Sequence, residues 1–279
     1  MADQLGLIEV RRALEEDRAG EDVTTRLLGA AATQSADARF VAEGRVVVAG
    51  VPLLTTVFHE LDPAVVITPA IAEGSWTPAG ATIATVRGAA GALLAGERVA
   101  LNFLQRLSGI ATLTRQAVDA VLGTRAQITH TRKTTPGLRN LELYAVRIGG
   151  GVENRASLAD AILWKDNHWA LLNGGRSLRD ALRNAPANVP VIVEVESDDQ
   201  VEAALAAGVT HLLVDNQPPD QLAAWARHAG PAVTIQASGG ITGDMARAYA
   251  EAGASLIAIG ALTHSASAAP IRCDISTSD

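Results

Sequence analysis

The second half of the chain repeats one unit, which consists of a short apolar run, a polar turn and an alanine-rich stretch with helical spacing. The runs are nearly continuous in hydrophobicity and no hairpin turn joins one to the next, which is typical of parallel strands covered by helices. The runs are at about 127–130 and 160–164, and in VPVIVEVES, HLLVDNQ, AVTIQASGGI and SLIAIGALTHS. This pattern favours an α/β fold with a (β/α) barrel over an open doubly wound sheet, and no glycine-rich dinucleotide fingerprint follows any strand.

The first half of the chain has a different organisation. Residues 5–18 have the spacing of an amphipathic helix, and 36–88 contain short β-branched runs separated by Gly and Pro, which predict a small, mostly antiparallel sheet. Residues 96–123 again have helical spacing, interrupted by Ser108-Gly109, and predict two helices or one with a kink. A chain of 279 residues with these two patterns is expected to form two unequal domains.

Composition excludes several classes of protein. The formal net charge of −7 argues against nonspecific nucleic-acid binding, and no apolar run approaches the roughly 18 residues of a membrane span. The charged N-terminal sequence does not resemble a signal peptide, so a cytoplasmic location is expected. The single cysteine, Cys273, cannot form an internal disulfide.

Basic residues concentrate between residues 129 and 168. Of the 23 basic residues in the chain only Lys133 and Lys165 are lysines, and both lie in this segment. The segment contains Arg132, Lys133, Arg139, Arg147, Arg155 and Lys165. Guanidinium groups and an ammonium group at strand ends predict a pocket for a polyanionic substrate, although a solvated basic face is the alternative.

Acidic residues close two neighbouring predicted strands. Glu194 and Glu196 end one strand, and Asp215 with Asn216 ends the next. Because the carboxyl ends of parallel strands meet at one edge, these groups are candidates to hold Mg²⁺ or ribose hydroxyls. Ordinary capping of the loops is the alternative.

Small residues at two later strand ends suggest a phosphate site. Ser238-Gly239-Gly240 precede a helix expected near 242–252, where backbone N–H groups can approach an anion. Gly260, at the end of the last strand, is a candidate for the other side of the same cradle.

Several of these segments also resemble quinolinate phosphoribosyltransferases, in order and in spacing, from residue 20 to the C-terminus. The matching segments are GEDVTT, ERVALNFLQRLSGIAT, TRKTTPGLR, YAVRIGGG, KDNH, EVE, VDN, ASGGI and IGALTHS. The resemblance implies an α/β sandwich domain at 1–105, completed by about 266–279, and an open (β/α) barrel at 106–265. It also implies an enzyme that joins quinolinate to phosphoribosyl pyrophosphate with Mg²⁺ and forms nicotinate mononucleotide for NAD biosynthesis.

The same resemblance implies roles for individual residues. Lys133, Lys165, Glu194 and Asp215 are expected to be catalytic, the two acids holding Mg²⁺ directly or indirectly. The residues expected to bind substrate are Arg98, His130, Arg132, Asn154, Arg155, Ser238, Gly239, Gly260 and His264. Arg98 is expected to reach the site of a neighbouring subunit in a homodimer or higher oligomer.

Departures from the family pattern fall mainly in the part that would bind the ring acid. His130 replaces Asp, Leu143 replaces Lys, Glu153-Asn154 replaces Asn-His, and Gln236 replaces Glu. A less cationic region should weaken capture of a dicarboxylate relative to a monocarboxylate. Three alternatives therefore stay open: an ordinary quinolinate enzyme, a relative that uses another ring acid, and a noncatalytic anion-binding relative. KDNH favours the quinolinate branch over molybdenum-associated relatives of the same fold.

Overall fold

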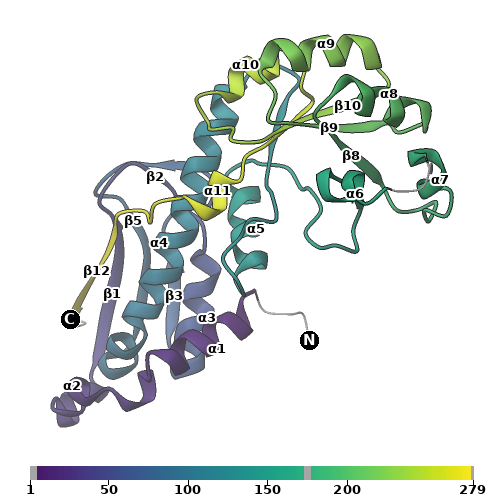
Figure 1. Cartoon of the computed structure of the whole chain (residues 1–279). Coiled ribbons are helices and arrows are strands. Elements are labelled where there is room, and N and C mark those ends of the chain that lie inside the picture. Colours follow the sequence, from purple (N-terminus) through teal and green to yellow (C-terminus); the bar gives the residue numbers. More distant parts are fainter. Residues whose placement is uncertain (1–4, 173–176, 278–279) are drawn as a thin grey trace. The chain divides into compact units, whose positions relative to one another are not determined.

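A computed structural model describes residues 5–172 and 177–277, which form two compact units (Figure 1). The first unit comprises Met1–Arg115, Thr135–Gly150 and Ala266–Asp279, and the second comprises Gln116–Thr134 and Gly151–Ser265. In this division 106–115 and 135–150 group with the first unit. Within the described residues, no helix combines the length and the apolar character that a bilayer crossing requires.

The first unit contains an antiparallel sheet of four strands, in the order β12-β1-β5-β3. Their bounds are β1 Ser35–Ala42, β3 Val66–Pro69, β5 Thr82–Ala89 and β12 Ile271–Thr277. A separate pair is formed by β2 Val46–Val47 and β4 Trp76–Thr77. Strand β12, yellow in Figure 1, pairs with β1 over seven residues, so the C-terminal segment is an integral part of this sheet.

Helices complete the first unit. Their bounds are α1 Leu7–Glu16, η1 Ala19–Glu21, α2 Val23–Arg26, η2 Gly29–Thr33, α3 Val51–Leu61, α4 Ala90–Ala120 and α5 Arg139–Ile148, with α4 continuing into the second unit. Helix α3 was not expected, although Gly50, with φ of 100°, and Pro52 in the first turn are helix-start signals.

The helix α4 is continuous over 31 residues and begins six residues earlier than expected. The Ser108-Gly109 pair does not break it. Ser108 is buried and its hydroxyl bonds the backbone of Ala49, while a Cβ at Gly109 would lie 1.9 Å from the carbonyl oxygen of Ser267. These two small residues therefore allow other chain segments to pack closely against the helix, and they do not mark a helix end.

The second unit is built on six parallel strands in the order β6-β11-β10-β9-β8-β7. The strands are β6 Gln127–Thr129, β7 Ile162–Trp164, β8 Val191–Val195, β9 His211–Asp215, β10 Thr234–Ser238 and β11 Leu256–Ala258. The helices are α6 Asp166–Ala170, α7 Leu178–Leu182, α8 Asp198–Ala206, α9 Pro219–Ala229, α10 Ala246–Glu251 and α11 Ala261–His264. This is the expected open (β/α) barrel, with β6 and β7 at its edges, and the prediction of fold class is confirmed.

Candidate active site

A cavity of about 480 Å³ lies at the carboxyl ends of the parallel strands of the second unit. Eight residues selected from the sequence line it: Arg132, Lys133, Asn154, Arg155, Lys165, Glu194, Asp215 and Ser238. The remaining lining residues are Thr131, Leu163, Asp166, Leu213, Gln236 and Ala258. The strand topology explains this gathering, because every parallel strand delivers its last residues to the same edge of the sheet.

Four cations line the cavity. Arg132 and Lys133 follow β6, Lys165 follows β7, and Arg155 lies on the segment between those strands. Burial lowers the pKa of Arg155, and the positive charge of Arg132 lowers it further. Since guanidinium groups this close repel each other, an anionic ligand between them would be strongly stabilised.

Two carboxylates share the cavity with these cations. Glu194 lies on β8 and Asp215 on the adjacent strand β9. Burial raises the pKa of Glu194, and the negative charge of Asp215 adds to the increase. A divalent cation or the hydroxyl groups of a sugar would relieve this repulsion, because both favour the ionised carboxylates.

The segment that carries Lys165 is fixed by local hydrogen bonds. Lys165 precedes the short helix α6, and its backbone N–H donates to Nδ1 of His168 at 3.2 Å. The indole N–H of Trp169 donates to the backbone oxygen of Glu194 at 2.9 Å, which ties α6 to the end of β8. Trp169 was not among the residues predicted for the site, because no sequence signal distinguishes this contact from ordinary packing of an indole.

His130 is not one of the residues that line the cavity, and it is only 1% exposed. Its Nε2 accepts a hydrogen bond from the backbone N–H of Asn154 at 3.0 Å, and the Asn154 amide donates back to the His130 carbonyl at 3.2 Å. The Asn154 side-chain oxygen also accepts from the N–H of Arg155 at 2.8 Å. His130 therefore holds the cavity-lining Asn154 and, through it, Arg155, whereas the family resemblance implies a role in substrate binding.

The glycines of the predicted phosphate cradle do not lead directly into the following helix. Gly239 and Gly240 have φ of 90° and 62°, and a Cβ at Gly239 would lie 2.4 Å from the backbone nitrogen of Asn216. Only glycine fits such a position. The helix α10 begins at Ala246 instead of near residue 242, so a turn separates it from the two glycines.

The remaining residues predicted for the site lie outside the cavity lining, some near the strand ends of the second unit and one in the first unit. Gly260 lies at the start of α11, where a Cβ would lie 3.1 Å from Nε2 of His264 and 3.3 Å from the Lys133 side chain. Gly239, Gly260 and His264 are near the strand ends but are not part of the cavity lining. Arg98 is exposed on α4, in the first unit.

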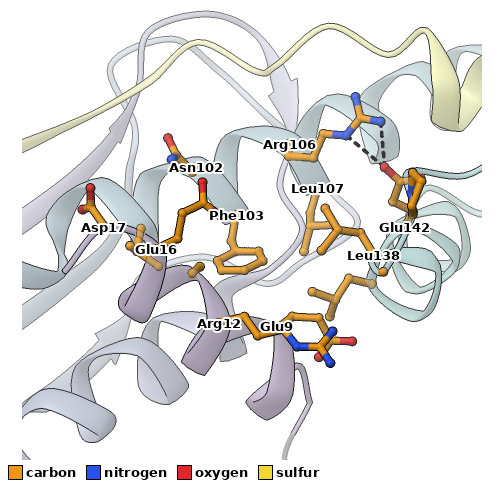
Figure 2. Close-up of a pocket in the computed structure, with 15 residues that line it drawn as sticks. Glu9, Arg12, Glu16, Asp17, Asn102, Phe103, Arg106, Leu107, Leu138 and Glu142 are labelled. Atoms are coloured by element: carbon orange, nitrogen blue, oxygen red, sulfur yellow. Dashed lines mark hydrogen bonds and ion pairs between the residues drawn. The ribbon is translucent and has the colours of Figure 1, made fainter. Parts of the chain in front are cut away.

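The first unit has a cavity of its own, of about 490 Å³, lined by residues of α1, α4, α5 and the turn before α5 (Figure 2). Val99, Phe103, Leu107 and Leu141 give it an apolar wall. Figure 2 shows Arg106 directed at Glu142 on one side of it. No sequence pattern indicated this cavity.

Comparisons with known proteins place these features in a family. The profile of the quinolinate phosphoribosyl transferase C-terminal domain matches residues 110–274, and the profile of the N-terminal domain of the same family matches residues 22–108. The chain is 39% identical to a probable carboxylating nicotinate-nucleotide pyrophosphorylase of Bacillus subtilis, over 95% of this chain and 91% of the relative. It is 40% identical to the Mycobacterium leprae carboxylating nicotinate-nucleotide pyrophosphorylase, over 95% of each.

A solved structure agrees with these matches. The crystal structure of nicotinate-nucleotide pyrophosphorylase from Ehrlichia chaffeensis superimposes with a TM-score of 0.91 at 34% identity. The superposition covers 99% of this chain and all of that one.

Proposed function

The chain belongs to the quinolinate phosphoribosyltransferase family, and we propose that it joins quinolinate to phosphoribosyl pyrophosphate, giving nicotinate mononucleotide, pyrophosphate and CO2. The observation that carries the proposal is the cavity of the second unit, where Arg132, Lys133, Arg155 and Lys165 face Glu194 and Asp215. A cationic wall suits the carboxylates and phosphates of the two substrates, and the acidic wall suits ribose hydroxyls.

The transfer step requires charge stabilisation more than covalent chemistry. The bond from the ribose anomeric carbon to pyrophosphate breaks as the ring nitrogen donates its electron pair to that carbon. Negative charge grows on the departing pyrophosphate, where the ammonium groups of Lys133 and Lys165 stabilise it. The guanidinium groups of Arg132 and Arg155 hold the ring acid in line for attack, so the cavity contributes mainly orientation and electrostatics.

Decarboxylation follows from the charge that transfer creates. After attack the ring nitrogen is quaternary, so the electron pair left when the neighbouring carboxylate departs as CO2 is stabilised by the adjacent positive charge. A proton then replaces the lost carboxylate on that ring carbon. The protein need only keep the remaining carboxylate paired with a cation, and Arg132 and Arg155 are placed for this.

The residues present fit a magnesium ion that enters with phosphoribosyl pyrophosphate. Glu194 and Asp215 line one cavity and the charge of Asp215 raises the pKa of Glu194, so a cation near both would relieve repulsion. Mg²⁺ is commonly held by one or two carboxylates together with substrate phosphates, and Glu194 and Asp215 would supply those carboxylates. When bound, Mg²⁺ would neutralise charge on the pyrophosphate.

An acceptor panel tests the proposed function. The purified protein would be offered quinolinate, nicotinate and related ring acids, each with phosphoribosyl pyrophosphate and Mg²⁺, and product nucleotide and pyrophosphate would be measured. We expect quinolinate to react much faster than every competitor, and chelation of Mg²⁺ to stop the reaction. Faster turnover of a monocarboxylate would instead support a specialised relative that uses another ring acid. This is the alternative suggested by the departures from the family pattern at His130, Leu143, Glu153 and Asn154. Absence of pyrophosphate release with every ring acid would support a noncatalytic relative.

Assembly is also a proposal. We expect a homodimer in which Arg98 of one subunit serves the cavity of the other, since Arg98 is an exposed cation outside the unit that holds the cavity. Mixing the variants Arg98→Ala and Lys165→Ala tests this. If Arg98 acts in trans, mixed dimers regain one intact site, and activity returns to about a quarter of the wild-type value. A mixture that stays inactive contradicts it. The cytoplasmic location likewise stays a prediction from the sequence.

A further inference from the structure

Asn216 directly follows the cavity-lining Asp215 and has an uncommon backbone conformation. Its φ is 53°, and within the described residues only Arg18 is another non-glycine residue with a positive φ. This left-handed region is costly for most L residues, although asparagine adopts it more readily than others. Such conformations persist only where surrounding contacts hold them, and they gather at functional sites. The conformation of Asn216 must therefore be held by contacts of its backbone and its side chain.

Backbone contacts fix Asn216 against the end of β10. Its N–H donates to the carbonyl oxygen of Ser238, the last residue of that strand, at 3.1 Å. A Cβ at Gly239 would clash with both the side-chain oxygen and the backbone nitrogen of Asn216, so this close approach requires glycine. Asn216 is thus fixed between the ends of two adjacent strands, β9 and β10, at the edge of the sheet where the cavity lies.

The side-chain amide of Asn216 holds the carboxylate of Asp215. Its Nδ2 donates to Oδ2 of Asp215 at 2.6 Å. A carboxylate only accepts hydrogen bonds, so the N–H group of the amide is the one that faces it. Within the described residues, this is the one hydrogen bond that the Asp215 carboxylate accepts. Oδ1 of Asp215 remains available to a ligand in the cavity, whereas Asn216 does not line the cavity itself.

A fixed Asp215 matters because its charge acts on Glu194, on the adjacent strand β8. Burial raises the pKa of Glu194 and the negative charge of Asp215 raises it further, so the two carboxylates repel each other. A free Asp215 side chain would turn away, and the hydrogen bond from Asn216 opposes that rotation. We propose that Asn216 is a positioning residue that holds Asp215 in place for the ribose and pyrophosphate groups of phosphoribosyl pyrophosphate. This inference rests on the proposed function and adds a residue that acts through Asp215.

Two variants that remove the amide test the positioning role. Glycine adopts the left-handed region freely, so Asn216→Gly should unfold at about the wild-type temperature, whereas Asn216→Ala should unfold about 2–4 °C lower. If the amide positions Asp215, KM for phosphoribosyl pyrophosphate should rise at least about threefold in both variants. KM for quinolinate should stay within about twofold of the wild type, because the ring acid binds the cationic wall.

A purely structural role predicts a different pattern. KM for phosphoribosyl pyrophosphate would then follow stability, staying at the wild-type value in Asn216→Gly and rising only in Asn216→Ala. That pattern, a smaller rise in both variants, or an equal rise for both substrates would overturn the proposal. The matched control is Arg18→Gly, which places glycine at the other left-handed position, exposed in the first unit, and should change neither constant.

Direct binding separates this inference from the proposed function. Calorimetric titration of phosphoribosyl pyrophosphate with Mg²⁺ into the wild type and Asn216→Gly needs no turnover. Weaker binding by the variant, with no nucleotide formed from quinolinate by the wild type, would support the inference and contradict the proposed function. Normal nucleotide formation with equal affinity and equal KM in both proteins would do the reverse. A wild-type protein that neither binds nor converts phosphoribosyl pyrophosphate would overturn both.

Discussion

Glu142 of α5 accepts hydrogen bonds through the single oxygen Oε1 from both Nε and Nη2 of Arg106 on α4, at 3.1 and 2.7 Å (Figure 2). The same carboxylate accepts from the backbone N–H and the hydroxyl of Thr135 at 3.0 and 2.8 Å. Glu142 is fully buried, whereas the Arg106 side chain keeps 27% of its exposure. Removing one partner of such a pair leaves an uncompensated charge, so the pair should matter to stability.

We expect Glu142→Gln to lower the free energy of unfolding by about 2–4 kcal/mol, because it leaves Arg106 without its counter-charge and weakens the bonds to Thr135. Urea titration followed by circular dichroism would measure this. The matched control is Asp37→Asn, which breaks the exposed pair between Asp37 and Arg87 and should cost less than about 1 kcal/mol. Equal losses in the two variants would contradict the assignment.

Lys165→Ala should reduce kcat about 100-fold or more while leaving the fold intact, since its proposed task is to stabilise charge on the departing pyrophosphate. Pyrophosphate release and circular dichroism would be recorded on the same preparation. Arg227→Ala removes a positive charge from an exposed position of α9 and should retain activity. Substantial turnover by the Lys165 variant would exclude Lys165 from the mechanism.

Glu194 should set the acid limb of the pH–rate profile. Its pKa is raised, first by burial and then by Asp215, so the carboxylate needed for ribose or metal is lost at a higher pH than for an ordinary glutamate. We expect kcat/KM to fall as the pH drops through this raised pKa. The Glu194→Gln variant should have low activity at every pH. Its residual activity should not fall at acidic pH in the way that the wild-type activity does.

The raised pKa of Glu194 also decides whether replacing this residue stabilises or destabilises the fold. A carboxyl with a raised pKa in the folded state stabilises the fold below its unfolded-state pKa, and this contribution is lost as the pH rises through the folded-state pKa. Near neutral pH, without ligands, Glu194→Gln should therefore unfold at a higher temperature than the wild type. The difference should shrink toward about pH 4, where the wild-type carboxyl is protonated. A Gln variant that is less stable than the wild type at neutral pH would contradict this account.

His130→Ala should lower the free energy of unfolding by about 1–3 kcal/mol, because the buried N–H of Asn154 loses its acceptor. It should also raise KM for quinolinate, since Asn154 and Arg155 lose their support. Thermal unfolding and steady-state kinetics measure the two effects. His228→Ala, at an exposed position paired with Glu202, is the control and should change neither.

The parallel part of the fold was predictable because each buried strand carries its own apolar run and the connections are short. Helix α3 was missed because VPLLTTVFHEL follows VVVAG and is itself rich in β-branched residues, which suggest a strand. The start of α10 was placed too early because residues 243–245 form a turn that spacing alone does not distinguish from a first helical turn.

The site was partly predictable for a topological reason. Strand ends converge in a parallel sheet, so polar residues such as Lys165, Glu194 and Asp215 could be grouped from the sequence alone. The position of His130 was not predictable, because it depends on a hydrogen bond to Asn154, 24 residues away. Gln236 lies on the same strand face as Ser238, and counting back two residues would have placed it in the cavity.

The pairing of β1 with β12 has a consequence for biosynthesis. Ala36 aligns with Thr277, so the edge of β1 meets its last partner only after residue 277 has left the ribosome. Until then β1 presents free backbone groups along one side, the kind of surface that invites association between nascent chains. Vectorial synthesis therefore delays completion of the N-terminal sheet until the barrel segments have already emerged.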